Sequence, residues 1–225
     1  MMEVLYEDNH VIGVVKPYNI PVQEDSSGDE DLLSMVKAYI KDRYNKPGKA
    51  FAALVHRLDR PSGGVIIFAR TSKAASRLGK AFNERKTAKE YLCVMHGKVT
   101  PSERKVVHYL RKDREKNIVT AHKKEVEGSK KAVLSYRVLE VKNYLSLVRV
   151  TLETGRSHQI RVQFKKIGHP LWGDHKYGRD AKGKQLALWS YSLAVPHPVK
   201  DSTINLCASP PDIAPWNLFK KSGAC

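Results

Sequence analysis

The sequence LVHRLDRPSGGVIIFA, residues 54–69, places a short charged loop between two apolar segments. The second segment, residues 64–69, shows no polar alternation, which is typical of a strand buried on both faces. Asp59 lies in the loop between Arg57 and Arg60. Nearby cations favour the ionised form of a carboxyl group, so this stretch predicts a strand, a loop and a strand that carry a candidate reactive carboxylate at the rim of a core.

A second interpretation of the same loop is an ordinary turn. Asp59 would then cap backbone amides, while Pro61 and the two following glycines would set the turn geometry. The residues alone leave both interpretations open.

The N-terminal part predicts a hairpin and a helix. Two β-rich runs at residues 4–6 and 11–15 flank the turn-prone residues 7–10, and Lys16-Pro17 ends the second run. Polar and acidic residues then precede an apolar face with helical spacing over residues 32–40. We interpret the acidic residues near position 30 mainly as charges that stabilise the start of this helix.

Further along the chain, the pattern predicts strands over residues 52–55, 91–95 and 145–152. It also predicts a helix capped by Ser72 that reaches about Arg85, and another from Ser157 to Ile167 that ends at Gly168. We expect short strands and an exposed loop over residues 104–131, and no periodic element after residue 178. Strands mixed with a few helices, without a clear boundary, predict one α+β (mixed α/β) domain over residues 1–225.

Composition and charge narrow the class of protein. The 225 residues contain 41% hydrophobic side chains, enough for a core, so intrinsic disorder is excluded. There are 40 Lys and Arg against 23 Asp and Glu, a net charge of +17. Residues 1–40 hold 2 basic and 8 acidic side chains (−6), which leaves 38 against 15 (+23) for residues 41–225. Such a basic field attracts nucleic acid phosphates, although solubility alone is the alternative explanation.

The sequence also predicts where the protein acts. No apolar run approaches the ~20 residues of a membrane-spanning helix, and the acidic start does not resemble a secretory signal. The 3 cysteines are odd in number and widely spaced, which favours reduced thiols over a disulfide framework or a zinc site. We therefore expect a cytoplasmic protein without a bound metal.

A second candidate functional segment is TGRSHQIRVQF, residues 154–164. If Ser157 caps a helix, His158, Arg161 and Lys165 share one side of it, opposite an apolar side. Arg156 and the free amides at such a helix start would suit a phosphate group. The alternative is a solvated amphipathic helix without a ligand.

Together these segments resemble a known family. The strings VHRLDR at residues 55–60 and TGRSHQIR at residues 154–161 occur in the order found in the RluA-type pseudouridine synthases. Matches at residues 8–17 (DNHVIGVVKP), 89–91 (KEY) and 168–174 (GHPLWGD) extend the resemblance over nearly the whole chain.

This resemblance implies a pseudouridine synthase-like α+β catalytic domain with a central, largely antiparallel sheet flanked by helices and loops. No separate S4-like RNA-binding domain is expected before it. The implied activity is the isomerisation of uridine to pseudouridine in structured RNA, ribosomal or transfer RNA, without a cofactor or a metal. The expected partner is therefore RNA, and the expected state is a monomer.

The resemblance also implies roles for individual residues. Asp59 matches the essential carboxylate, Tyr91 the aromatic residue that stacks on the target base, and Arg161 the arginine that pairs with Asp59. Six more residues of the two motifs are candidate RNA-binding residues: His56, Arg57, Arg60, Arg156, His158 and Gln159. The chain departs from the family pattern at Gln163 and Trp189, where histidine is common.

Two other functions remain possible on the sequence. A non-catalytic RNA-binding or ribosome-associated protein would keep the basic surface and use Asp59 only as a structural cap. A glycoside hydrolase would also cleave a glycosidic bond, but it needs two carboxyl groups about 5 to 9.5 Å apart, and nothing here marks a second one as a general acid.

Overall fold

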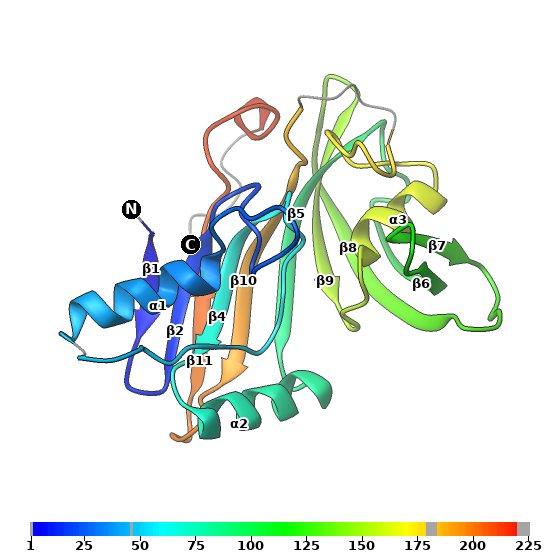
Figure 1. Ribbon diagram of the computed structural model, residues 1–225. Coiled ribbons are helices and arrows are strands. Elements are labelled where there is room, and N and C mark those ends of the chain that lie inside the picture. Colours follow the sequence, from blue (N-terminus) through cyan, green and yellow to red (C-terminus); the bar gives the residue numbers. More distant parts are fainter. Residues whose placement is uncertain (1, 46, 179–183, 220–225) are drawn as a thin grey trace. The chain divides into compact units, whose positions relative to one another are not determined.

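The computed structural model describes residues 2–45, 47–178 and 184–219 (Figure 1). These residues group into two compact units. Unit 1 consists of residues up to 88 together with residues 190–209, and unit 2 consists of residues 89–189 together with the described residues from 210 onward. The chain thus leaves unit 1 after residue 88, returns to it at residue 190 and leaves it again after residue 209.

Unit 1 is a β-sheet with two helices. Its strands follow the order β1-β2-β4-β10, and two strands off this path, β11 and the short β3, pair with β10 and β4 respectively. The pairings of β1 with β2, β2 with β4, β3 with β4 and β10 with β11 are antiparallel. The strands are β1 (Val4–Glu7), β2 (Val11–Lys16), β3 (Ala53–Leu54), β4 (Gly63–Ala69), β10 (Leu188–Pro196) and β11 (Thr203–Cys207).

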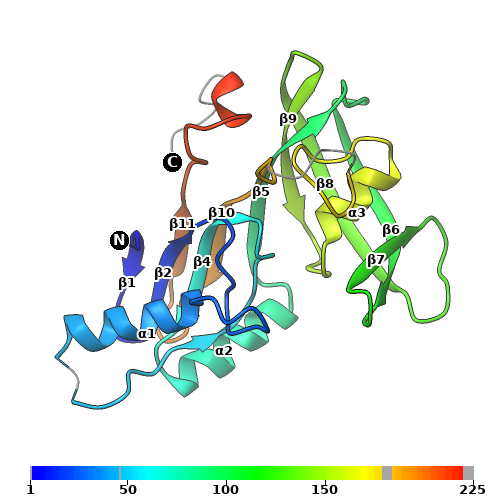
Figure 2. The same ribbon diagram turned by 45° about the horizontal axis from the view of Figure 1, so that its top comes forward.

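The helices of unit 1 bury one apolar face each. Helix α1 (Leu32–Arg43) begins after Asp31, whose carboxylate accepts a hydrogen bond from the Ser34 amide. Helix α2 (Ser72–Asn83) is capped in the same way by Thr71. Both helices lie on the same face of the sheet in the two ribbon views (Figures 1 and 2). Strand β4 is buried throughout, as its continuous apolar run predicts.

Unit 2 is an antiparallel sheet with one helix. Its strands follow the order β5-β9-β8-β6-β7, and every adjacent pair is antiparallel. Their bounds are β5 (Ala88–His96), β6 (Glu103–Asp113), β7 (Ile118–His122), β8 (Lys130–Lys142) and β9 (Leu145–Leu152). Helix α3 (Gln159–Lys166) covers one face of this sheet, and a 3₁₀ turn (Trp216–Leu218) follows near the end of the described chain.

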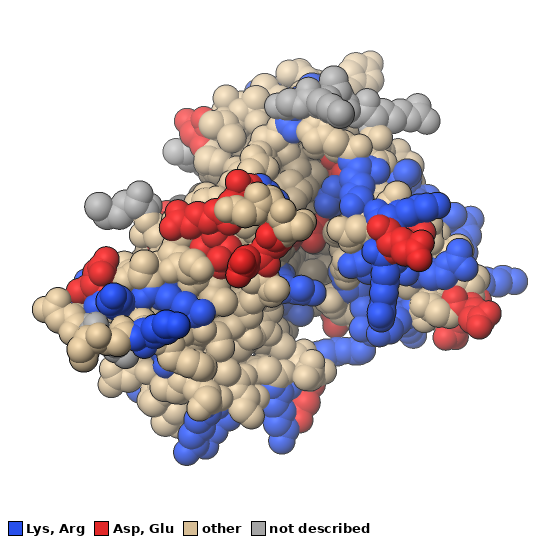
Figure 3. Space-filling view, viewed as in Figure 1, with Lys and Arg blue, Asp and Glu red and all other residues tan. Residues whose placement is uncertain are grey.

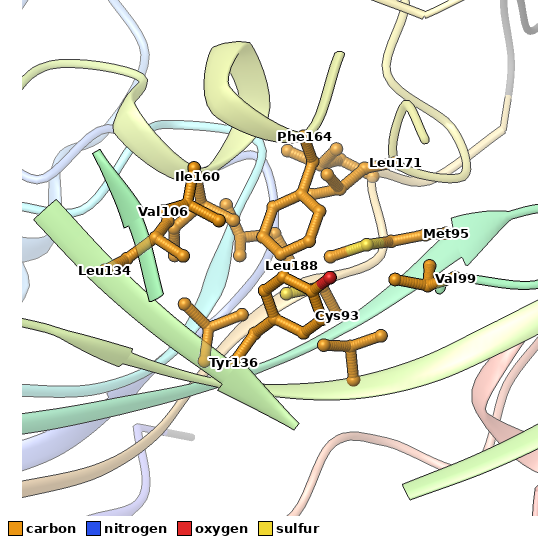
Figure 4. Close-up of a cluster of buried hydrophobic side chains, with 13 residues drawn as sticks. Cys93, Met95, Val99, Val106, Leu134, Tyr136, Ile160, Phe164, Leu171 and Leu188 are labelled. Atoms are coloured by element: carbon orange, nitrogen blue, oxygen red, sulfur yellow. The ribbon is translucent and has the colours of Figure 1, made fainter. Parts of the chain in front are cut away.

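The core of unit 2 lies between α3 and the sheet. Figure 4 shows Ile160 and Phe164 of α3 among buried strand residues. The rings of Phe164 and Tyr136 have centroids 5.2 Å apart, within the range of favourable aromatic pairs. The Tyr136 hydroxyl donates to the carbonyl of Pro101, so its polar end is satisfied at the edge of the core.

Much of this architecture agrees with the sequence-based prediction. The α+β class, the N-terminal hairpin, the strand over residues 145–152 and the helix after residue 31 are confirmed. Two details were wrong: Thr71 rather than Ser72 caps α2, and α3 is shorter than the predicted helix. Residues 104–131 contain the predicted strands and exposed loop residues, but the first of these strands, β6, is long, with 11 residues.

Three strands were missed altogether: β8, β10 and β11. In strand β8 the alternation of buried and exposed residues is interrupted by three consecutive buried residues, Ala132 to Leu134, and by a bulge between Val138 and Glu140. The expectation of reduced thiols holds for Cys93, which is free and buried, but it is wrong for Cys207, which is disulfide-bonded. Among the described residues, no helix is both long and apolar enough to cross a membrane.

Gly64, at the start of β4, allows two backbone segments of unit 1 to lie against each other. Its φ of +112° is rarely adopted by residues with a side chain. A Cβ atom at this position would overlap the carbonyl of Ser190 and lie 2.6 Å from its amide nitrogen. The glycine is therefore required by the close approach of the two segments.

We expect Gly64→Ala to lower the free energy of unfolding by about 1–3 kcal/mol, because the added methyl group has no space. Gly79→Ala in α2 is the matched control, because a Cβ there meets nothing within 4 Å. The control should stabilise the helix by about 0.5–1 kcal/mol. Urea denaturation measures both changes, and equal unfolding midpoints for the two variants would contradict the crowding at residue 64.

Candidate active site

Asp59 lies half-buried in the loop between β3 and β4 of unit 1. Its main-chain carbonyl accepts two hydrogen bonds from Ser62, one from the amide at 3.0 Å and one from the hydroxyl at 2.8 Å. His56 fixes the loop at its other end, since its Nε2 accepts a hydrogen bond from the Ile67 amide and its ring stacks on Phe82 of α2. The loop that carries Asp59 is thus held on both sides, by hydrogen bonds to main-chain groups and by the stacked His56 ring.

Lys16, at the end of β2, is a fully buried cation next to this loop, with an exposed fraction of 0%. Its ammonium donates hydrogen bonds to the carbonyls of Pro17 (2.9 Å), Arg60 (2.9 Å) and Ser62 (2.7 Å). Burial lowers the pKa of Lys16 to about 7, while the negative charge of Asp59 acts to raise it. Sequence reasoning missed this role, although a lysine that ends an apolar strand was a visible signal.

Arg57 and Arg60 flank Asp59 but are placed differently. Arg57 is exposed. Arg60 donates to the carbonyl of Asn19 and forms ion pairs with Asp25 and Asp29 of the segment before α1. The interpretation of the acidic residues near position 30 as helix-start charges is therefore wrong for Asp29, which with Asp25 ties its segment to the Asp59 loop, and it is confirmed for Asp31, which caps α1.

Tyr91 lies near the start of β5 in unit 2, opposite Val150 of β9. Its ring is partly buried and packs against the hydrophobic core beneath α3. It therefore faces the same side of the sheet as α3, which carries Arg161. Within unit 2 the aromatic and the arginine of the predicted site are on one face.

Arg161 forms a buried, two-point ion pair with Asp174. Its Nε and Nη2 atoms lie 2.9 and 2.8 Å from the two carboxylate oxygens, and the two side chains are only 6% and 1% exposed. Asp174 also accepts hydrogen bonds from the amides of Lys176 and Tyr177. Bidentate contacts fix the orientation of a guanidinium group. The pairing of Arg161 with Asp59 stays a prediction.

The Tyr177 ring packs against the face of the Arg161 guanidinium group. The Arg161 Cζ atom lies 5.0 Å from the centre of the Tyr177 ring, within cation–π range. The Tyr177 hydroxyl accepts a hydrogen bond from the Val119 amide and lies 2.6 Å from Nδ1 of His158. Asp174 and Tyr177 were not singled out from the sequence.

The start of α3 differs from the predicted cap. His158, rather than Ser157, occupies the cap position, with φ of +52° and no capping side chain. Gln159 is 3% exposed and organises the preceding turn through hydrogen bonds from Thr154 and from the Arg156 amide. Arg156 is exposed, and its Nε donates to the carbonyl of Lys131.

The surface charge of the two units differs in the space-filling view. Lys and Arg side chains gather over unit 2, where α3, β6 and β7 lie in Figure 1, and acidic side chains gather over unit 1 (Figure 3). No group of three or more His, Cys, Asp or Glu side chains in the described part of the chain is arranged to hold a metal ion.

An anchored, half-buried carboxylate in unit 1, and an aromatic ring and an oriented guanidinium group on one face of the strongly basic unit 2, are features typical of an enzyme that acts on RNA. Comparison with known proteins identifies the family within this class. The sequence model described as "RNA pseudouridylate synthase" matches residues 10–166, and the chain belongs to this family. It is an RNA pseudouridine synthase of the RluA type.

Curated relatives cover most of the chain. The uncharacterized RNA pseudouridine synthase YhcT of Bacillus subtilis is 31% identical over 207 residues, which cover 90% of this chain and 67% of the relative. Ribosomal large subunit pseudouridine synthase C of Buchnera aphidicola is 32% identical, with 97% and 68% covered. Among solved structures, human RNA pseudouridylate synthase domain containing 4 shares the fold, with a TM-score of 0.78, 22% identity and coverage of 93% and 88%.

We expect Lys16→Met to destabilise unit 1 and displace the Asp59 loop. The variant leaves buried carbonyl groups without their donor, which costs about 1–3 kcal/mol for each unsatisfied group. Lys37→Met, at an exposed position of α1, is the matched control. Turnover should fall strongly in the Lys16 variant at a temperature where both variants are folded. Wild-type turnover would show that Lys16 does not position the loop.

For unit 2, we expect Asp174→Asn to cost about 3–5 kcal/mol of stability, because it leaves the Arg161 charge buried without a counter-ion. Glu153→Gln removes an exposed ion pair with Lys105, and it should cost no more than about 1 kcal/mol. Guanidinium denaturation of both variants measures the difference. Similar costs for the two variants would rule out a special role for the buried pair.

Proposed function

We propose that Asp59 performs the chemistry of this pseudouridine synthase on a uridine that has been flipped out of structured RNA. The observation that carries the proposal is the half-buried Asp59 carboxylate on a loop held by Lys16, Ser62 and His56. A carboxylate on a fixed loop can meet the sugar or the base of an extruded nucleotide in a defined orientation. Asp59 acts as a nucleophile or as a base.

The reaction is balanced within the substrate. The bond between N1 of uracil and C1′ of the ribose breaks, the base rotates, and a bond forms between C5 and C1′. The proton leaves C5 and the N1 position regains one, so the product is an isomer of the substrate. The proposed enzyme therefore needs neither a cofactor nor a metal.

Tyr91 and Arg161 complete the proposed site from unit 2. Flipping a base out of its stack costs a few kcal/mol, which stacking on an aromatic ring such as Tyr91 offsets. Arg161 would pair with Asp59 and keep it ionised. A guanidinium group has five N–H donors, and Asp174 takes two of them. Asp174 would therefore fix the orientation of the group.

The candidate RNA-binding residues divide into two kinds. Arg57 and Arg156 are exposed, and we propose that they contact phosphates or fill the space left by the flipped nucleotide. Arg60 would exchange its ion pairs with Asp25 and Asp29 for RNA phosphates. His56, His158 and Gln159 already bind other groups of the protein, and we propose that they shape the RNA-contacting loops.

The proposed substrate is ribosomal or transfer RNA. Several relatives bear the name ribosomal large subunit pseudouridine synthase, which favours ribosomal RNA. We propose that both units form one catalytic domain, because the family match at residues 10–166 includes parts of each. We further propose that the protein acts as a monomer in the cytoplasm. Mapping of pseudouridines in RNA from cells with and without the protein would identify the modified position.

We expect Asp59→Asn to abolish tritium release from RNA that carries 5-tritiated uridine, because the amide can neither attack nor accept the proton. RNA affinity should stay within a few fold, since one carboxylate contributes little to phosphate binding. Asp42→Asn is a matched control that removes an exposed acid of unit 1, on α1 and outside the loop. Turnover by the Asp59 variant would disprove the mechanism, and an equal loss in both variants would indicate a charge effect.

A further inference from the structure

The turn between β8 and β9 contains an unusual residue. Lys142 pairs with Leu145, so the turn has two central residues, Asn143 and Tyr144. Their φ values are +51° and +57°, as in the type I′ turn of two-residue hairpins. This turn favours asparagine at the first position and glycine at the second. Asn143 follows the preference, whereas Tyr144 violates it.

Tyr144 adopts a backbone conformation that is unfavourable for any bulky side chain. The ring gains nothing visible from the protein in return, because the residue is 88% exposed, the highest value among the large hydrophobic residues of the described chain that lie on the surface. Glycine at this position would make a more stable hairpin. An unfavourable conformation that persists without packing indicates a function outside folding.

The surroundings of Tyr144 are suited to RNA. Its carbonyl accepts a hydrogen bond from the Gly97 amide at 2.7 Å, which docks the turn onto the end of β5. Lys98, which follows Gly97, and Lys142, which precedes the turn, are both exposed cations. Aromatic rings beside cations are the combination that binds single-stranded RNA, because bases stack on the ring and phosphates bind the cations.

A second aromatic group lies at the same end of unit 2. His96 is the cross-strand partner of Leu145, the residue that follows Tyr144. The His96 ring stacks on Trp172, and the Lys184 ammonium lies 4.2 Å from the centre of the Trp172 ring. In Figure 1 the β8–β9 turn is at the upper end of unit 2, where β5 ends. Aromatic and cationic groups therefore gather at this end of the sheet.

We propose that Tyr144 stacks on an unpaired base of the substrate RNA, with Lys98 and Lys142 at the neighbouring phosphates. This inference rests on the proposed action on structured RNA. Tyr91 lies five residues before His96 on β5, which corresponds to about 17 Å along the strand. At that distance Tyr144 contacts a nucleotide that flanks the target uridine, so it contributes to substrate binding and not to the chemical step.

The test uses Tyr144→Gly in the full chain and measures its melting temperature, its affinity for RNA and its turnover. If Tyr144 had only a structural role, the melting temperature and the affinity would fall together. We expect the melting temperature to rise by about 2–4 °C, because glycine fits the turn. We expect the affinity for a short fluorescein-labelled oligouridylate to fall about fivefold or more, because the stacking ring is lost. In turnover of an unmodified large-subunit ribosomal RNA transcript, KM should rise while kcat stays unchanged.

Two further variants serve as controls. Tyr144→Phe keeps the ring and should bind the oligouridylate like the wild type. Phe51→Ala removes an exposed aromatic side chain of unit 1 and should leave the affinity unchanged.

Wild-type affinity in Tyr144→Gly would overturn the inference, and so would a lower melting temperature, since the turn would then need the ring. Neither result would affect the proposal for Asp59. That proposal fails separately if Asp59→Asn retains activity.

Discussion

The buried ammonium of Lys16 is the contact on which unit 1 depends for a functional loop. Transfer of a charged group from water into the protein interior costs several kcal/mol of folding free energy unless protein groups replace the hydrogen bonds that water made. Three main-chain carbonyls do so here, and two of them belong to the segment that contains Asp59. The lysine therefore joins the end of β2 to the Asp59 loop and places a positive charge near the carboxylate. A hydrophobic side chain would be easier to bury, but it could not hold carbonyl groups.

Unit 2 also contains a buried charged group, but there the charge is stabilised by an ion pair and not by main-chain carbonyls. Arg161 has a carboxylate partner, Asp174, and both groups are also fixed by neighbours, Arg161 by the Tyr177 ring and Asp174 by two backbone amides. A buried ion pair of this kind is weak evidence for stability, because desolvation offsets the attraction. Its clear consequence is orientation, since the planar guanidinium group can turn in only one way.

The sequence predicted elements whose pattern is local. Strand β9 and helix α1 follow from apolar periodicity, and the family motifs identified Asp59, Tyr91 and Arg161 as candidates. The sequence did not predict which residues these candidates contact. Lys16 contacts the Asp59 loop from 44 and 46 residues away, and although a lysine at the end of an apolar strand is unusual, the sequence does not tell which carbonyl groups it binds. Strand β8 was missed because three consecutive residues, Ala132 to Leu134, are buried and a bulge lies between Val138 and Glu140, so the alternation that marks a half-exposed strand is interrupted.

Tyr144 and Lys16 show the same principle in opposite surroundings. Each residue is less favourable for folding than an available alternative, glycine in the turn and an apolar side chain in the core. Local rules are broken in natural proteins mainly at functional sites, where stability is given up for a contact that folding does not need. For Lys16 that contact is the position of the Asp59 loop, which lies inside the protein. For Tyr144, 88% exposed, the partner has to come from solution, and in a basic RNA-modifying enzyme the base of an RNA nucleotide fits an uncovered ring.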